Sequence, residues 1–173
     1  DYKTSTQIIC DLVDIISKNG RLLLNIGPKA DGTIPDEDRK ILLEIGQWLK
    51  TNGEAIYGAK LWRKSEEGPT KIKEGELMDA EIKPFTFEDI RFTMNGSYVY
   101  AICLNMRGKD NVFIKSLAET SNAHEPNFNG IIKSVEVLGY DKHPEWSRDD
   151  KGLSIKTVRI DNDMPVVFKV FID

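Results

Sequence analysis

Three consecutive leucines lie in the segment Arg21-Leu22-Leu23-Leu24-Asn25-Ile26, which ends at Gly27-Pro28. An unbroken apolar run, rather than an alternation of apolar and polar residues, is typical of a strand buried on both faces of a parallel sheet. A glycine followed by a proline is a common way for such a strand to end. The segment therefore predicts a strand in the interior of an α/β domain.

A helical pattern lies on each side of this segment. Upstream, residues 4–6 offer a cap, and Asn19-Gly20, a pair that tolerates positive φ, ends the pattern. Downstream, Pro35 precedes a first turn rich in acids, and the pattern ends at Asn52-Gly53. The apolar stripes that predict the two helices are Ile8, Ile9, Leu12, Val13, Ile15 and Ile16, then Ile41, Leu42, Ile45, Trp48 and Leu49.

The predicted strand needs parallel neighbours, and each neighbour would bring its own crossover helix. From about Arg63 onward the hydrophobic period changes from 3.6 to 2, and no further helix is predicted. Later residues therefore cannot build the missing sheet. We expect residues 1–62 to be the end of a larger α/β domain and to dock on the rest of it, because one strand and two helices alone expose a wide apolar surface.

The rest of the chain, residues 63–173, is predicted to be an antiparallel β-sandwich domain. Its boundary is marked by Ser65-Glu66-Glu67-Gly68-Pro69, and Asn95-Gly96 between two apolar runs is a strong hairpin signal. About six strands at regular spacing favour a sandwich. The runs are residues 90–94, 97–104, 112–117, 131–138, 153–160 and 166–172.

Composition narrows the classes of function. The 173 residues are 40% hydrophobic and 30% charged, with a net charge of −4, as in globular proteins. No apolar run approaches the roughly 18 residues of a membrane helix, and the first ten residues do not resemble a signal peptide. No cluster of lysine and arginine suits a phosphate backbone. We therefore expect neither a membrane nor a nucleic-acid partner.

Several residues invite a chemical interpretation that their context does not support. The loop 27–32 lacks both the Gly-Lys-Ser/Thr step and the dinucleotide glycine spacing, so nucleotide binding is disfavoured. Asp31, Asp36 and Asp38 lack the spacing of a calcium loop, and acids in a first helical turn favour the helix dipole. No metal and no cofactor are expected.

Cysteine, histidine and tryptophan residues are assigned mainly structural roles. Cys10 and Cys103 lie in apolar runs and are predicted to be buried, whereas the only histidines, His124 and His143, lie in turn-rich segments and are predicted at the surface. Trp48 falls on the core stripe of the second helix. The other tryptophans, Trp62 and Trp146, lie in predicted loops where an aromatic face could stack on a sugar, although packing is favoured for both.

A pair of carboxylates at one site would suit a glycosidase, and Glu54 and Asp31 are conceivable partners. Nothing in their spacing requires such a pair. Reasoning from the residues alone therefore ends at part of an α/β domain followed by a β-sandwich.

Residues 12–35 resemble the closing strand and loop of the α-L-fucosidases of glycoside hydrolase family 29, most clearly in Leu22-Leu23-Leu24-Asn25-Ile26-Gly27-Pro28 and Ala30-Asp31-Gly32-Thr33-Ile34-Pro35. The resemblance continues through residues 45–50, 52–58, 85–86, 89–93, 100–101, 114–117 and 137–140. Two stretches depart from the family: Ala59-Lys60-Leu61-Trp62 replaces a Thr-Arg-Pro-Trp-like stretch, and residues 118–129 are hard to align.

The resemblance implies a (β/α)8-like barrel followed by a C-terminal β-sandwich, with residues 21–26 as the last barrel strand. It also implies retaining hydrolysis of terminal α-L-fucosyl groups through a covalent glycosyl-enzyme. An aspartate nucleophile and a separate acid/base carboxylate, about 5 Å apart, perform that reaction. In the family both precede the stretch present here, so no catalytic residue is assigned to this chain, which we expect to be structural and inactive alone.

The same resemblance suggests where substrate would approach. Active sites of such barrels lie at the C-terminal ends of the strands, which makes Asn25, Lys29 and Asp31 candidate substrate-binding residues. The alternative is that this loop only turns the chain and caps the next helix. Expected partners are a fucosylated glycan and the remainder of the catalytic domain. The family implies a periplasmic, extracellular or lysosomal location without deciding among them.

For the sandwich, two roles remain open. Bracing of the barrel is favoured, as at many domain interfaces. The alternative function is that of a non-catalytic carbohydrate-binding module.

Overall fold

The structure is a computed structural model that describes residues 3–71, 84–120 and 128–173. Its helices are α1 (Ser5–Ser17) and α2 (Asp36–Asn52), followed by the 3-10 turns η1 (Gly53–Ala55) and η2 (Lys115–Leu117). Its strands are β1 (Glu66–Glu67), β2 (Ile90–Asn95), β3 (Tyr98–Cys103), β4 (Asn111–Ile114), β5 (Ile132–Val137), β6 (Glu145–Arg148), β7 (Leu153–Lys156) and β8 (Val166–Ile172).

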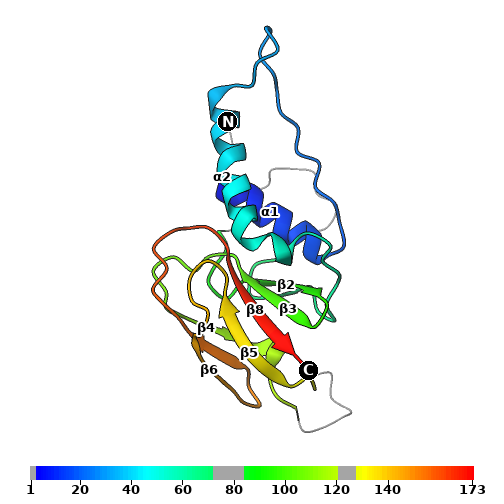
Figure 1. The fold of residues 1–173 in the computed structure, drawn as a ribbon, viewed down its shortest axis with the longest axis vertical. Helices are drawn as coiled ribbons and strands as arrows, with labels where there is room; N and C mark the ends of the chain where they lie inside the picture. Colours follow the sequence, from blue (N-terminus) through cyan, green and yellow to red (C-terminus); the bar gives the residue numbers. More distant parts are fainter. Residues whose placement is uncertain (1–2, 72–83, 121–127) are drawn as a thin grey trace.

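The strands form two antiparallel sheets, and the helices cover the outer face of the larger one (Figure 1). The five-stranded sheet has the order β1-β2-β3-β8-β5, and the three-stranded sheet has the order β4-β7-β6. The predicted sandwich is therefore confirmed. The larger sheet is also the middle of three layers.

Two-sided burial explains the sequence of the central strand β3. Val99 and Ala101 face the core between the two sheets, whereas Tyr100 and Ile102 face the helices. A strand covered on both faces has no solvent side on which polar residues are favoured. Consequently the apolar surface predicted for the helices is partly covered by the C-terminal sheet of this same chain.

The predicted hairpin is confirmed, since β2 and β3 pair from Ile90–Cys103 to Asn95–Tyr98 around Gly96, whose φ is +58°. Two strands were not predicted. One is β1, which has only two residues, both glutamates, and the other is β6. Trp146 therefore lies on a strand, not in the loop that the sequence suggested, because its pairing with Ile155 places it in the small sheet.

Both predicted helices are present. Thr4 caps α1 by accepting a hydrogen bond from the backbone N–H of Gln7, and Asn19 adopts a φ of +64° while Gly20 N–H donates to Ile15 O. The end of α2 differs from expectation, because Gly53 has a φ of −61°. A Cβ at Gly53 would meet the Tyr57 ring at 2.7 Å, and that exposed ring would have to move.

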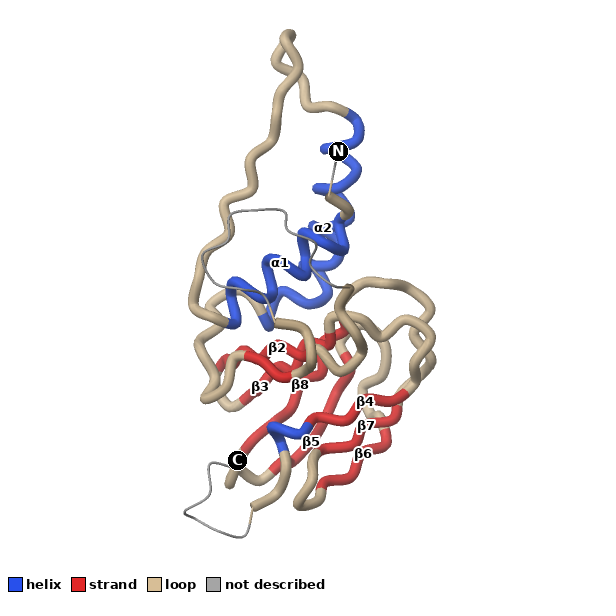
Figure 2. The backbone as a smooth tube through the Cα atoms, turned by 180° about the vertical axis from the view of Figure 1, so that it is seen from behind, coloured by secondary structure: helices blue, strands red, loops and turns tan. Residues whose placement is uncertain are grey.

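The strand predicted at residues 21–26 is not formed. These residues make the outgoing limb of a long arm, residues 18–35, that projects beyond the helices (Figures 1 and 2). Within the described parts of the chain no strand pairs with them. Leu23 is 93% exposed and Leu24 is 41% exposed. The leucine run therefore lacks the neighbours that would make it a buried strand.

Cys10 and Cys103 are buried, as predicted, and burial raises the pKa of each thiol to about 12. His143 is exposed, as predicted, whereas His124 lies outside the described residues. Among the helices that the structure describes, none combines the length and the apolar character that crossing a membrane requires.

Candidate functional site

The projecting arm carries every residue that the sequence nominated for substrate binding. Its tip is a turn in which Gly32 N–H donates to Lys29 O at 2.9 Å and Lys29 N–H donates to Thr33 O at 2.8 Å. The carboxylate of Asp31 accepts hydrogen bonds from the hydroxyl and the backbone N–H of Thr33 at 2.7 and 3.0 Å. The Thr33 hydrogen bonds lower the pKa of Asp31 below its usual range. The tip is thus locally ordered by its own side chains.

The structure brings two of the three nominated residues together. Lys29 and Asp31 share the tip turn, while Asn25 lies four residues earlier on the outgoing limb, and all three are exposed. The tip turn lies at the end of the arm farthest from the sandwich (Figure 2), and Asn25 lies on the limb that leads to it. If the arm is a barrel strand, that end is its C-terminal one, where substrate is expected.

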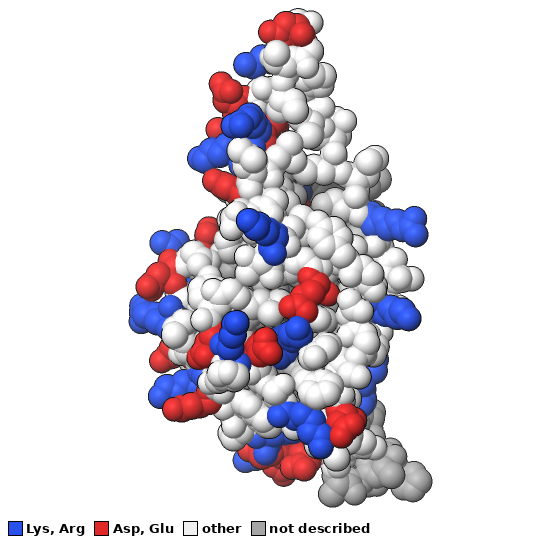
Figure 3. Space-filling view, viewed as in Figure 1, with Lys and Arg blue, Asp and Glu red and all other residues white. Residues whose placement is uncertain are grey.

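The limb that leads to the tip is apolar. Leu23, Leu24 and Ile34 are exposed on the arm, and Leu43 is exposed on α2. On the face shown in Figure 3, charges of both signs are interspersed over the sandwich, whereas much of the outgoing limb is uncharged. Neighbouring large apolar side chains that are exposed, such as Leu23 and Leu24, are typical of a contact with another part of a protein.

A buried charge cluster holds the base of the arm to the sandwich. Arg91 on β2 has a fully buried side chain, and its Nε donates to the carboxylate of Asp14 on α1. Lys18, at the start of the arm, pairs with Asp14 at 2.9 Å and with Glu66 at 3.3 Å. Glu66 Oε2 also lies 3.6 Å from Arg91 Nη2. Two strands, one helix and the first residue of the arm therefore meet at one cluster.

The electrostatics of the cluster favour ionised side chains. Burial raises the pKa of the Glu66 carboxyl. The hydrogen bond from Lys71 and the charges of Arg91 and Lys18 lower that pKa by more, so it lies below its usual value. The guanidinium carbon of Arg91 also lies 5.6 Å from the centre of the Phe85 ring. Because a lone buried charge is costly, these groups depend on one another.

The sequence analysis missed Asp14 and Arg91. Each is a charged residue inside an otherwise apolar pattern, Asp14 on the helical stripe and Arg91 between Ile90 and Phe92. A charge at a position that periodicity assigns to a core face is the signal that would have found them. Their positions in the pattern could not show that they pair, because 77 residues separate them.

A second polar contact joins the end of α2 to the large sheet. The Glu54 carboxylate accepts hydrogen bonds from the Tyr100 hydroxyl at 3.0 Å and from Lys169 Nζ at 2.7 Å. Burial, and then the Glu54 carboxylate, raise the pKa of Tyr100. Nearby, Trp48 Nε1 donates to Pro165 O at 2.8 Å.

Glu54 and Asp31 do not form an acid/base pair in this structure. Asp31 precedes α2 and Glu54 follows it, and a helix of 17 residues is about 25 Å long. Glu54 is moreover committed to Tyr100 and Lys169. The two carboxylates therefore cannot act on one glycosidic bond within this chain.

Trp62 and Trp146, the two tryptophans considered for stacking on a sugar, differ in how far they are buried. Trp62 is only 8% exposed and packs against Phe92 and Phe128, with ring centres 4.8 and 5.7 Å away, so its packing role is confirmed. Trp146 is 37% exposed at the rim of the small sheet. Residues 3–71, 84–120 and 128–173 hold no group of three histidine, cysteine or acidic side chains placed to bind a metal ion.

Comparison with protein-family models gives two matches. A model described as alpha-L-fucosidase matches residues 1–54, and a model described as alpha-L-fucosidase C-terminal domain matches residues 83–168. Among curated proteins, the tissue alpha-L-fucosidase of Homo sapiens is 34% identical over 156 residues, which cover 90% of this chain and 28% of the relative. The chain therefore spans little more than a quarter of that relative's length.

The solved structures that resemble this chain are also fucosidases. The alpha-fucosidase of Thermotoga maritima in complex with fucose is 26% identical with a TM-score of 0.70, over 97% of this chain and 34% of the other. Alpha-L-fucosidase isoenzyme 1 from Paenibacillus thiaminolyticus is 26% identical with a TM-score of 0.72, over 100% and 35% of the two chains. Both matches span the arm, the helices and the sandwich together.

Proposed function

This chain belongs to the α-L-fucosidase family, and from that premise we propose that it works as the C-terminal part of a longer retaining α-L-fucosidase. The full-length protein hydrolyses terminal α-L-fucosyl groups of glycoconjugates. The observation that carries the proposal is the continuous likeness to fucosidases, by family models over residues 1–54 and 83–168 and by fold over nearly the whole chain. The fucose bound by the relative supports the class of substrate.

Within that protein, the arm serves as a strand of the catalytic barrel. Three observations support this role: no strand of the described residues pairs with the leucine run, Leu23 and Leu24 are exposed, and the polypeptide on either side is helical. Each strand of such a barrel is followed by a helix, so an inner strand lies between two helices in the sequence. Upstream strands of the barrel would supply the neighbours that the arm lacks.

Asn25, Lys29 and Asp31 then lie at the rim of the active site, where they contact substrate or support the residues that do. Lys29 and Asp31 lie in the tip turn and Asn25 lies near the end of the proposed strand that leads to it, which supports this role. The nucleophile and the acid/base belong to the upstream part of the barrel.

The sandwich, residues 63–173, braces the barrel from the opposite side. The Arg91 cluster includes Lys18 at the base of the arm, and the Trp48–Pro165 contact joins α2 to the residue before β8. A domain that binds there stabilises the last strand and its helices without entering the active site.

We expect the purified 173-residue chain to release no p-nitrophenol from p-nitrophenyl α-L-fucoside, while the full-length protein releases it. The physical reason is that retaining hydrolysis needs two carboxylates across one scissile bond, and the proposal assigns both to the upstream part of the barrel. A spectrophotometric assay of both proteins at equal molar concentration measures the difference.

Circular dichroism of the short chain is the control, because inactivity means nothing if that chain is unfolded. Comparable turnover by the folded short chain would disprove the assignment of the catalytic carboxylates to the upstream part. A full-length protein without fucosidase activity would disprove the proposed function itself.

A further inference from the structure

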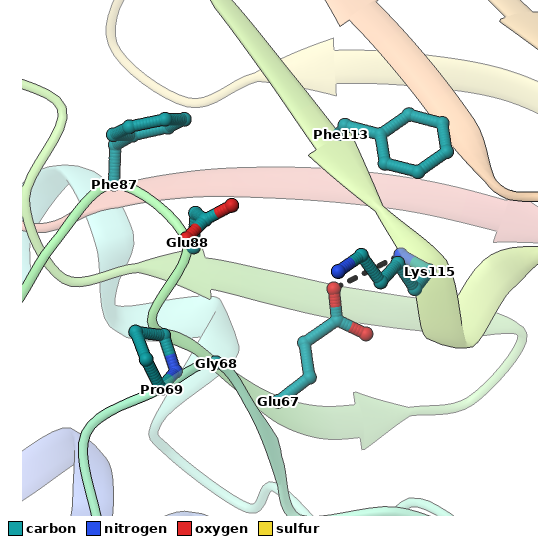
Figure 4. Close-up of a pocket in the computed structure, with 7 residues that line it drawn as sticks. All are labelled: Glu67, Gly68, Pro69, Phe87, Glu88, Phe113 and Lys115. Atoms are coloured by element: carbon teal, nitrogen blue, oxygen red, sulfur yellow. Dashed lines mark hydrogen bonds between the residues drawn. The ribbon is translucent and has the colours of Figure 1, made fainter.

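A cavity of about 340 Å³ opens where the edges of the two sheets meet, on the side of β1 and β4 (Figure 4). Its volume falls within the roughly 300–1,000 Å³ range of small-molecule sites. The lining residues are Glu67, Gly68, Pro69, Phe87, Glu88, Phe113 and Lys115. None of them was nominated from the sequence.

Two aromatic side chains stand on opposite sides of the cavity. Phe87 is 39% exposed and Phe113 is 41% exposed, and Figure 4 shows them separated by open space. Lys109 Nζ lies 4.5 Å from the centre of the Phe87 ring and covers part of it. Phe113 points outward from β4, whose neighbours Val112 and Ile114 are buried. Both rings therefore offer apolar surface to an occupant.

Charged groups of opposite sign lie between the rings. Among the described residues neither the Glu88 carboxylate nor the Lys115 ammonium has a hydrogen-bond or ion-pair partner. Glu67 is different, because its carboxylate accepts hydrogen bonds from the backbone N–H groups of Lys115 and Ser116 at 2.9 and 2.7 Å. That contact ties β1 to the end of β4 and fixes the floor of the cavity.

The loop that presents Phe87 and Glu88 is held rigidly. Asp89 is fully buried, and its carboxylate accepts hydrogen bonds from the backbone N–H and hydroxyl groups of both Thr70 and Thr86 at 2.7–3.0 Å. Gly68 packs against this loop with a φ of +120°, and a Cβ there would lie 2.5 Å from Asp89 Oδ1. A preformed site of this kind loses little entropy when it binds.

We propose that this cavity is a binding site for a neutral pyranose of a glycan. The C–H face of a pyranose matches an exposed aromatic ring, and its hydroxyls can donate to Glu88 and accept from Lys115. Because groups of both signs line the cavity, it offers no single-sign field that would favour an anion or a cation. The further statement that this glycan is part of the enzyme's substrate rests on the proposed function.

Titration of the ¹⁵N-labelled 173-residue chain with methyl α-L-fucopyranoside and methyl β-D-galactopyranoside tests the site by NMR. We expect saturable shift changes centred on the amides of Phe87, Glu88 and Lys115 at millimolar concentrations of at least one sugar. The Phe113→Ala and Glu88→Gln variants should each raise Kd about tenfold. The second variant keeps the size of the side chain, so its fold is preserved.

Trp146→Ala is the matched control, because it removes another half-exposed aromatic of the sandwich outside this cavity. It should leave Kd unchanged. Absence of shift changes with both sugars, or loss of binding in Trp146→Ala alone, would overturn the proposal, as would shifts produced only by an apolar peptide probe. Because titration involves no hydrolysis, its outcome is separate from that of the fucosidase assay.

Discussion

Replacing Arg91 with methionine is expected to destabilise the 173-residue chain by about 3–5 kcal/mol, the usual cost of breaking a buried ion pair by removing one partner. The Arg91 side chain is 0% exposed, and its loss leaves the carboxylates of Asp14 and Glu66 beside each other with Lys18 as their remaining shared cation. Urea unfolding followed by circular dichroism measures the change.

Arg107→Met is the control, because Arg107 is an exposed arginine on the same sandwich, and the expected change is within about 0.5 kcal/mol. The double variant Asp14→Leu/Arg91→Met should recover much of the loss, since an apolar pair can replace a buried ion pair. A single Arg91→Met variant as stable as Arg107→Met would refute the role of the cluster in joining the helices to the sheet.

Substitution of Leu23 by aspartate is expected to change the stability of the 173-residue chain very little and to destabilise the full-length protein strongly. In the 173-residue chain Leu23 is 93% exposed, so the free energy of unfolding should change by less than about 0.5 kcal/mol. In the full-length protein the same position becomes the interior of a barrel sheet, where an unpaired charge costs several kcal/mol. Fucosidase activity should therefore be lost together with stability.

Val158→Asp is a suitable comparison, because Val158 is 49% exposed in the sandwich and should tolerate the charge in both proteins. Urea unfolding of both chains and the aryl fucoside assay of the full-length protein give the two readouts. A full-length Leu23→Asp enzyme with normal stability and turnover would rule out the barrel strand.

The local parts of the fold could be predicted because their signals are short-range. Periodicity gave α1 and α2, and Asn95-Gly96 gave the β2–β3 hairpin. By contrast, β1 has two glutamates and no alternation, and its strand character comes only from pairing with β2. No local pattern could have revealed it.

The leucine run shows a different limit. Its residues indicated a strand buried on both faces, but burial needs neighbours, and the described chain provides none. Under the proposed function, the longer protein supplies those neighbours. It would also cover Leu24 and Ile34, which are exposed here.

The candidate site was predictable only in part. Asn25, Lys29 and Asp31 followed from the motif, but the cavity between Phe87 and Phe113 joins residues 26 positions apart that meet only through the packing of two sheets. Likewise, nothing local to Asp14 identifies Arg91 as its partner. Such pairs become visible only when the three layers are assembled.

Amide hydrogen exchange at residues 22–26 tests the central claim most directly. If the arm is a barrel strand that lacks its neighbours here, these amides should exchange at nearly unprotected rates in the 173-residue chain and become strongly protected in the full-length protein. The amides of β3 serve as a reference that is protected in both. Equal protection of residues 22–26 in the two proteins, or none in the full-length protein, would contradict the account.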